Sequence, residues 1–345
     1  MSNQHTDGFT DREINKLIEL NGKGLGPKEI SNYFPDRTYT SIRTKLINMR
    51  LGMKSKETKI LSFVSGEENN KQSKLELLLE ANRPSVVEIP TDKFFGERIR
   101  FGAIADTHLG SKYERLDALN NFYDILLKEG IKVVYHGGNY VDGEFYYNKY
   151  EVYIHGFDDM IKNFLKKYPK REGIETYFIT GDDHSGWWMQ REGIDPGKII
   201  QERQTEFDRN DLHYLGYQEA DIILKAKNGQ VVMKLMHAGG GTAYADSYST
   251  QRMVEAFQEG EKPAVLLVGH YHKAVYHFPR GVHVLQLGTF QDQTRFMRKN
   301  KIKAHVGGWI VELNQGPTGE INRFKPEFIN YYDRGFYIKH EHKNG

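Results

Sequence analysis

The chain has 345 residues, of which 38% are hydrophobic and 27% are charged, and these values predict a globular protein of about two or three domains. It contains no cysteine, which excludes disulfides and thiolate metal sites and leaves His, Asp, Glu and Asn as possible metal ligands. The formal net charge is only +2, so the charge of the whole molecule decides nothing about nucleic acid, and local patches must be considered instead.

Residues 1–54 predict a small helix-turn-helix unit with three helices. Thr10 and Glu13 have the spacing of a capping box, in which each side chain accepts a hydrogen bond from the backbone N–H of the other residue. Pro27 suits the first turn of a second helix. Thr40 is placed to begin the third.

Cations on the third helix give this unit its predicted function. The helix would carry Arg43, Lys45 and Arg50, and a short helix with exposed cations can enter the major groove while the cations neutralise phosphates. The pattern resembles Myb/SANT-like modules in segments 9–13, 26–30 and 37–43. This resemblance implies a DNA partner, and a protein-docking bundle with a solvated basic face is the alternative.

The rest of the chain changes character twice. Residues 55–96 predict a polar linker with one short helix, and residues 316–345 a polar, aromatic-rich tail. Residues 97–315 alternate between strand-like and helix-like segments, which predicts an α/β domain with its chemistry in loops at strand ends. The predicted strands are 98–105, 131–135, 176–180, 231–236, 264–268, 283–287 and 309–313, and the predicted helices are 116–127, 150–167 and 250–257.

Polar segments follow five of these strands. Their candidate metal ligands and acid are Asp106, His108, Asn139, Asp183, His184, His237, His270 and His272. Side chains alternate along a strand, so Asp-x-His and His-x-His each place two ligands on the same side. A single pair of this kind is a weak signal, but five segments in succession predict a metal site with imidazole and carboxylate ligands.

In this order the segments resemble the calcineurin-like metallophosphoesterases, and among them nucleases of the Mre11/SbcD type, over about residues 97–315. The resemblance implies a β-sandwich flanked by helices and two divalent ions that clamp a phosphate. It also implies roles for single residues: Asp106, His108 and His272 for one ion, Asp183, His237 and His270 for the other, residue 139 as the bridge, and His184 as the acid. Mn is the expected metal, with Fe, Zn and Co as alternatives.

Two positions depart from the family pattern. Asn139 stands where the family has a bridging Asp, and Asp183 stands where it usually has Asn. The formal charge of the ligands is unchanged, but an amide offers one oxygen, and its NH₂ group repels a cation. We therefore expect one tightly held ion, one loosely held ion and impaired turnover. An alignment that places Asp182 at the family's Asn position is less favourable, because it separates the ligand from His184.

Two further features concern the substrate. Arg295, Arg298 and Lys299 form a basic cluster that could contact a phosphate backbone, with a solvated loop as the alternative. Trp187 and Trp188 are more often core residues than base-stacking ones.

Together these features predict a metal-dependent DNA phosphodiesterase. The alternatives are a phosphatase or phosphodiesterase acting on nucleotides or phosphoproteins, and a DNA-binding protein whose metal site has decayed. The sequence shows neither a signal peptide nor an apolar run of membrane-spanning length, so we expect a cytoplasmic protein without a membrane partner. A homo-oligomer is left open.

Overall fold

The computed structural model describes residues 9–23, 25–48, 85–89, 98–145, 148–241, 243–258 and 260–331. The chain divides into two compact units, Met1–Asn82 and Arg83–Gly345, called here the helical unit and the α/β unit. The predicted linker helix and Arg50 lie outside the described residues. No helix of the described ranges is long and apolar enough to cross a membrane.

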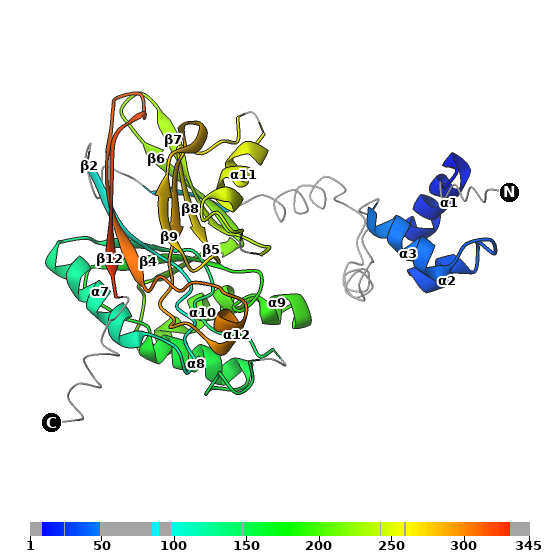
Figure 1. Cartoon of the computed structure of the whole chain (residues 1–345), viewed down its shortest axis with the longest axis horizontal. Coiled ribbons are helices and arrows are strands. Elements are labelled where there is room, and N and C mark those ends of the chain that lie inside the picture. Colours follow the sequence, from blue (N-terminus) through cyan, green and yellow to red (C-terminus); the bar gives the residue numbers. More distant parts are fainter. Residues whose placement is uncertain are drawn as a thin grey trace, which may run out of the picture. The chain divides into compact units, whose positions relative to one another are not determined.

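The helical unit contains α1 (Asp11–Gly22), α2 (Pro27–Ser31) and α3 (Tyr39–Asn48) (Figure 1). The predicted capping box is present: the Thr10 N–H donates to Glu13 Oε2 at 2.7 Å, and the Glu13 N–H donates to Thr10 Oγ1 at 3.3 Å. One residue from each helix, Leu17, Ile30 and Ile42, is completely buried. These contacts give the unit a core of its own.

The α/β unit is built on two six-stranded mixed sheets. The first runs in the order β1 (Ser85–Ile89), β6 (Glu219–Lys225), β7 (Gln230–His237), β8 (Val265–Gly269), β10 (His283–Leu287) and β9 (Ala274–His277). The second runs in the order β12 (Ile321–Asn330), β11 (Gly307–Gln315), β2 (Arg98–Ile104), β3 (Val133–His136), β4 (Glu175–Thr180) and β5 (Leu212–Tyr217).

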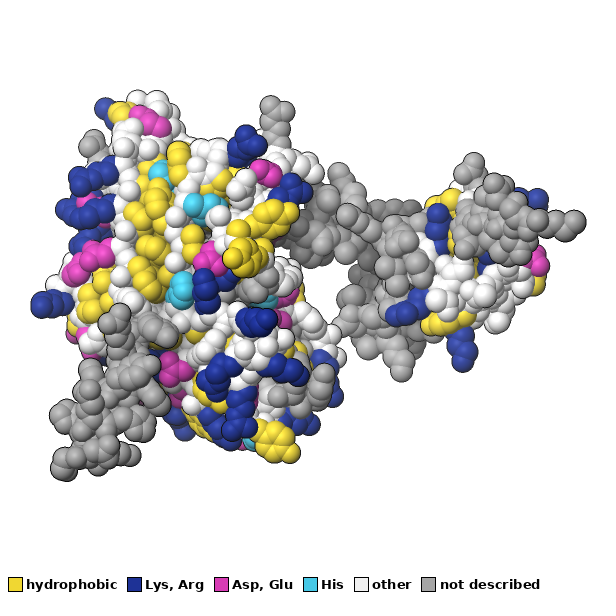
Figure 2. Space-filling view, in the orientation of Figure 1, with side chains coloured by type: hydrophobic (Ala, Val, Ile, Leu, Met, Phe, Trp, Pro, Cys, Tyr) yellow, Lys and Arg dark blue, Asp and Glu magenta, His cyan; other side chains and the backbone are white. Residues whose placement is uncertain are grey.

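The edge strands β9 and β12 carry aromatic side chains. Tyr276 stacks on Phe324 with the ring centroids 5.5 Å apart, and Phe324 stacks on His283 at 4.3 Å. Figure 2 shows hydrophobic and His side chains gathered over this part of the α/β unit. Phe324 of the predicted tail therefore packs on the sandwich, while residues 332–345 of that tail lie outside the described residues.

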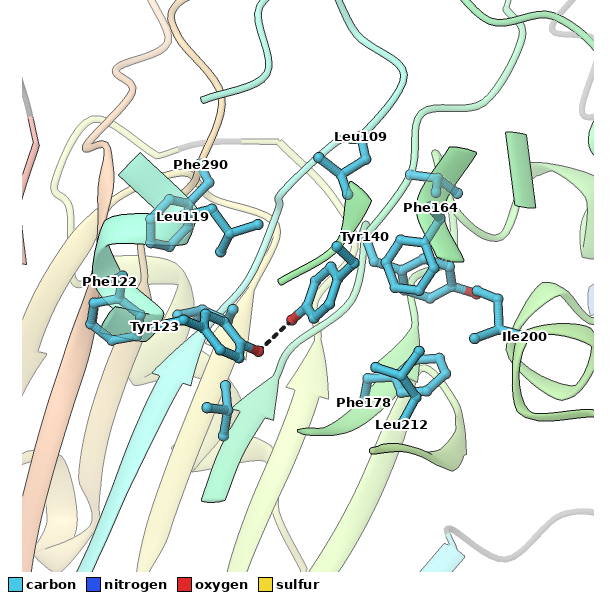
Figure 3. Packing of buried hydrophobic residues seen from close by; sticks show 14 of the residues in the cluster. Leu109, Leu119, Phe122, Tyr123, Tyr140, Phe164, Phe178, Ile200, Leu212 and Phe290 are labelled. Carbon is cyan, nitrogen blue, oxygen red and sulfur yellow. Dashed lines mark hydrogen bonds between the residues drawn. The ribbon is translucent and has the colours of Figure 1, made fainter. Parts of the chain in front are cut away.

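The sheets face each other across an apolar core, and helices cover their outer faces. Phe101, Ile222 and Leu267 are fully buried between the sheets. The helices α7 (Leu116–Lys128), α8 (Phe157–Lys167) and α10 (Pro196–Arg203) pack on the second sheet through a cluster that contains Tyr140 and Phe164, whose rings lie 5.2 Å apart (Figure 3). The helix α11 (Tyr248–Ala256) packs on the first sheet. The predicted α/β sandwich with flanking helices is confirmed.

Several element boundaries differ from the sequence prediction. The helix predicted at 150–167 begins only at Phe157, because Gly156 has a φ of 83°. The strands β1 and β12 lie in the segments predicted as linker and tail. Each adds to the edge of a sheet, β1 beside β6 and β12 beside β11. Edge strands are half exposed, so their hydrophobic pattern is weak in the sequence.

Candidate metal centre

The five polar segments meet at one end of the sandwich. The strands β2, β3 and β4 are parallel neighbours, as are β7 and β8, so the loops that follow them leave from the same edges. Backbone hydrogen bonds join these loops: Asp106 N–H donates to Gly138 O and His108 N–H to Asn139 O, both at 3.0 Å. His270 N–H donates to Asp106 Oδ2 at 2.7 Å, which connects the two sheets at this point.

The backbone turns left-handed at five of these ligand positions. Asp106, His108, Asn139, His270 and His272 have φ between 45° and 90°, a region that costs a non-glycine residue about 1–3 kcal/mol. Such residues persist only where the surrounding structure fixes them, and they concentrate at functional sites. Here the turns bring the side chains together.

The first cluster consists of Asp106, His108 and His272, all buried, with ligand atoms within 4.8 Å of one another. Asp106 Oδ1 lies 3.4 Å from His272 Nε2 and 3.6 Å from His108 Nε2. His108 Nδ1 lies 2.8 Å from Asp142 Oδ1, and if this nitrogen donates, Nε2 keeps its lone pair for a metal. The Nε2 atoms of His108 and His272 are only 3.2 Å apart, so a proton or a cation is needed to relieve the repulsion of their lone pairs.

The second cluster joins Asp183, His237 and His270, again within 4.8 Å. His237 Nδ1 lies 2.6 Å from Gly137 O, and His270 Nε2 lies 2.7 Å from Gly240 O. A carbonyl only accepts hydrogen bonds, so these nitrogens are the protonated ones. His237 Nε2 and His270 Nδ1 are therefore left facing Asp183, at 3.6 and 3.7 Å.

Both clusters contain donor atoms that fit a divalent cation. Asp106 Oδ1 and His237 Nε2 belong to buried side chains and have no hydrogen-bond partner. Buried polar atoms without partners are costly and rare in proteins. Imidazole and carboxylate ligands, oriented by backbone carbonyls and a further carboxylate, are typical of transition-metal sites.

The pKa shifts of the site residues also favour a bound cation. Burial lowers the pKa of His108, but the Asp142 and Asp106 carboxylates outweigh this effect and raise its pKa to about 10. Burial also opposes the charged form of His237, but Asp183 and Asp106 raise its pKa to about 9. Burial raises the pKa of Asp106, yet the neighbouring histidines, His272 first among them, hold that pKa well below its usual range. A field that attracts protons to the imidazoles also attracts metal cations.

Asn139, the predicted bridge, lies between the clusters and hydrogen-bonds to its neighbours. Its Nδ2 donates to Asp183 Oδ1 at 2.8 Å. Its Oδ1 accepts from Ser185 N–H at 3.2 Å and Ser185 Oγ at 3.3 Å. A Cβ at Gly181 would lie 2.4 Å from Asn139 Oδ1, so only glycine leaves room for this approach.

His184, the predicted acid, lies beside the first cluster. Its Nδ1 is 2.5 Å from Asp142 Oδ1, the same oxygen that contacts His108. Asp142 is buried and was not among the predicted site residues. Its signal in the sequence is its position three residues after Asn139 in the same polar segment, but a single Asp in a loop has no assigned role until its partners are known.

The clusters open into a cavity of about 350 Å³. Asn139, Asp183 and His184 line it, together with Phe296 and Met297 of α12 (Arg295–Lys299). The predicted basic cluster is on this helix, where Arg295, Arg298 and Lys299 are exposed. Figure 2 shows Lys and Arg side chains gathered over the region of α12 and the adjoining helices.

The remaining candidates do not belong to the two clusters. Trp188 is buried and packs against Phe157 at 5.4 Å, so it is a core residue. Trp187 is partly buried in the short helix α9 (Trp187–Glu192). In the helical unit, Arg43 is exposed and Lys45 is partly buried, with its Nζ 5.6 Å from the centre of the Phe9 ring.

Comparisons with known proteins found one family model and several similar solved structures. The family model described as calcineurin-like phosphoesterase matches residues 99–274. No match was found among curated proteins. Among solved structures, an archaeal phosphodiesterase is similar at 12% identity over 67% of this chain and 100% of its own, with a TM-score of 0.37. Vps29 of Entamoeba histolytica in complex with Zn²⁺ is similar at 13% identity over 67% and 99%, with a TM-score of 0.31.

Proposed function

The chain belongs to the calcineurin-like phosphoesterase family, and on that premise we propose that it is a metal-dependent phosphodiesterase that cuts DNA. The observation that carries the proposal is one cavity that is lined by residues of both His/Asp clusters and by two residues of α12, the helix whose Arg295, Arg298 and Lys299 are exposed. Metal ions held by the clusters would hydrolyse a phosphoric ester, and the basic helix would bind further phosphates of the same substrate.

Each group of the site has a chemical task in this proposal. Two divalent ions, when bound, would polarise the phosphate and activate the attacking water. Asp106, His108 and His272 would hold one ion, and Asp183, His237 and His270 the other. Mn suits this mixture of imidazole and carboxylate, and Fe, Zn and Co share the preference. His184 keeps its Nδ1 on Asp142, and its Nε2 would hold a proton for the leaving oxygen.

The basic residues of α12 favour a polymeric substrate over a small phosphate ester. Arg298 Nη1 donates to the carbonyl of Gln293, which fixes one cation at the start of α12. A small phosphate would be bound by the metal centre alone. A DNA strand also has flanking phosphates, and these can reach cations beyond the cavity. The exposed Arg43 of the helical unit would add sequence-independent affinity in the same way.

The test compares a polymer with a small diester. The full chain with Mn should cut plasmid or single-stranded DNA and hydrolyse bis-(p-nitrophenyl) phosphate. Replacing Arg295, Arg298 and Lys299 together by Gln should lower kcat/KM on DNA by about tenfold or more, because each lost phosphate contact weakens binding. Hydrolysis of the small diester should be unchanged.

A matched control removes three exposed cations at the opposite strand ends. Lys128, Lys132 and Arg323 are exposed, and replacing them together by Gln changes the net charge equally. If both triple variants reduce DNA cutting alike, the effect is one of overall charge and α12 has no special role. If the chain hydrolyses nucleotides or phosphopeptides but leaves DNA intact, the phosphatase alternative replaces this proposal.

A further inference from the structure

The second metal cluster contains an additional carboxylate. Asp182 lies next to Asp183 in the chain, and the two carboxylates come within 4.8 Å of each other and of the ring nitrogens of His237 and His270. The sequence-based assignment made Asp183 the ligand and disfavoured Asp182, because a ligand at position 182 would be separated from His184. The loop after β4 turns it toward them.

We infer that Asp182 is a fourth ligand of the second ion and that Asn139 is a positioning residue for Asp183. The second ion would then have two carboxylates and two imidazoles as protein ligands without any ligand from residue 139. This inference rests on the metal centre of the proposed function. It reverses the sequence-based expectation that the second ion is loosely held.

Unpartnered atoms point into this cluster from both sides. Asp182 Oδ1 is buried and has no hydrogen-bond partner. His237 is 3% exposed, and its Nε2, which faces Asp183, is also without a partner. Within the described ranges, no Lys or Arg forms an ion pair with Asp182 or Asp183. Two adjacent carboxylates repel each other, and a bound divalent cation relieves this repulsion.

Asn139 is engaged in a way that suits positioning and not bridging. Its only oxygen accepts both hydrogen bonds of Ser185, and its amide nitrogen donates to Asp183 Oδ1. Ser185 Oγ also accepts from the N–H groups of Asn139, at 3.2 Å, and Gly181, at 2.9 Å. These bonds hold the loop of residues 181–186 against the loop after β3. Asp183 is thereby oriented with Oδ2 toward His270.

The loop has no room for a different arrangement. A Cβ at Gly186 would lie 2.1 Å from the carbonyl oxygen of Gly181. The chain is therefore folded back tightly between these glycines, with both aspartates in the turn. A turn this tight places neighbouring carboxylates at one point, where a single cation can bind both.

The experiment measures metal content and not turnover. The full chain is saturated with Mn, freed of excess ion by gel filtration, and analysed by elemental mass spectrometry and calorimetric titration. We expect two ions per chain. Asp182→Asn should weaken one of them by at least about tenfold, the smallest loss typical even for groups that only support a ligand. Glu192→Gln, which removes an exposed carboxylate of α9, should leave both ions in place.

A double variant tests whether the carboxylate can be moved. Asn139→Asp combined with Asp182→Asn returns a carboxylate to the bridging position, and it should recover the second ion that Asp182→Asn loses. Asn139→Asp alone should not tighten the second ion appreciably, because that ion already has two carboxylates. A gain of tenfold or more from Asn139→Asp alone would contradict the inference.

Thermal unfolding separates a metal ligand from a structural residue. All three Trp of the chain are in the α/β unit, so Trp fluorescence reports its melting temperature. In EDTA, Asp182→Asn should raise this temperature, since it removes repulsion between neighbouring carboxylates. With Mn it should reduce the metal-induced rise, since a weaker ion stabilises less. A structural residue would instead lower both.

The possible failures are distinguishable. If the wild-type chain binds no divalent ion, the proposed function fails together with this inference. If wild type and Asp182→Asn both hold two ions with equal affinity, only the role of Asp182 is overturned. Should Asp182→Asn fail to fold, Asp182→Ser provides the same measurement with a smaller side chain at this partly exposed position.

Discussion

The helical unit and the α/β unit satisfy their polar groups in different ways. In the described part of the helical unit, no buried side-chain nitrogen or oxygen lacks a partner. Its helix start is capped by Thr10 and Glu13, and Glu13 also pairs with Arg37 at 2.9 Å. In the α/β unit, Asp106, Asp182, His237 and His272 of the two metal clusters each keep a buried atom without a partner. A bound cation would give these four atoms of the α/β unit a partner, whereas the described part of the helical unit needs no such group.

The same difference appears in the backbone. None of the described non-glycine residues of the helical unit has a positive φ, whereas Asp106, His108 and Asn139 of the α/β unit do. Strain and unpartnered polar atoms coincide in the α/β unit. This coincidence is expected where binding energy offsets the cost of the fold.

The largest expected effect is the loss of turnover when the metal or one of its protein ligands is removed. EDTA, or His270→Ala, should reduce turnover of a small diester by about 10²-fold or more, because the electrostatic stabilisation of the phosphate is lost. Elemental analysis should show a matching loss of metal, while Trp fluorescence shows a folded α/β unit. His213→Ala, at a histidine of β5 that pairs with Glu175, is the control. Full turnover in EDTA would contradict the metal centre.

The next effect is the pH dependence of metal affinity. The pKa of His108 is raised to about 10 and that of His237 to about 9, so in the metal-free protein both rings are protonated at pH 7. Metal must displace these protons, and affinity should rise as pH increases, by about tenfold per pH unit for each proton released. Calorimetry in buffers with different ionisation enthalpies measures the number released. No proton release at pH 7 would show that the rings are already neutral.

These pKa shifts also have a consequence for metal-free stability. A raised histidine pKa contributes stability that is fully present below the unfolded value of about 6.5 and is lost as pH rises through about 9–10. The metal-free α/β unit should therefore melt at a lower temperature at pH 10 than at pH 7. The described part of the helical unit contains no histidine, so this effect should not appear there.

A smaller effect is expected in DNA binding by the helical unit. Replacing Arg43 and Lys45 by Gln should weaken binding and reduce the slope of log affinity against log salt by about 2, one for each phosphate contact. Lys23→Gln is the control, since Lys23 is already paired with Glu19 at 2.5 Å. An unchanged slope in the double variant would favour the protein-docking alternative for this unit.

The smallest effect concerns the helix cap. Thr10→Ala removes the acceptor for the Glu13 N–H and should cost the helical unit about 1 kcal/mol. Hydrogen exchange of α1 amides measures this locally, and the Trp-reported unfolding of the α/β unit should stay the same. A parallel loss in both units would show that they unfold together.

The spacing of residues along the chain is enough to predict the helix cap and the ligand pairs. The capping box depends on residues three positions apart, and the Asp-x-His and His-x-His pairs depend on alternation along a strand, so both can be predicted without knowing the fold. The order of the five polar segments likewise predicted one metal site. Its predicted ligands Asp106, His108, Asp183, His237, His270 and His272 lie in the two clusters.

Only the tertiary structure shows which further carboxylates lie beside the predicted metal ligands. Asp142 and Asp182 become site residues because parallel strand pairing and left-handed turns bring their loops beside histidines far away in the sequence. The protonated nitrogen of His237 is set by the carbonyl of Gly137, one hundred residues distant. Side-chain periodicity acts over a few residues, whereas hydrogen bonds and charges act through space, and the chain path that makes them neighbours is fixed only when the sheets assemble.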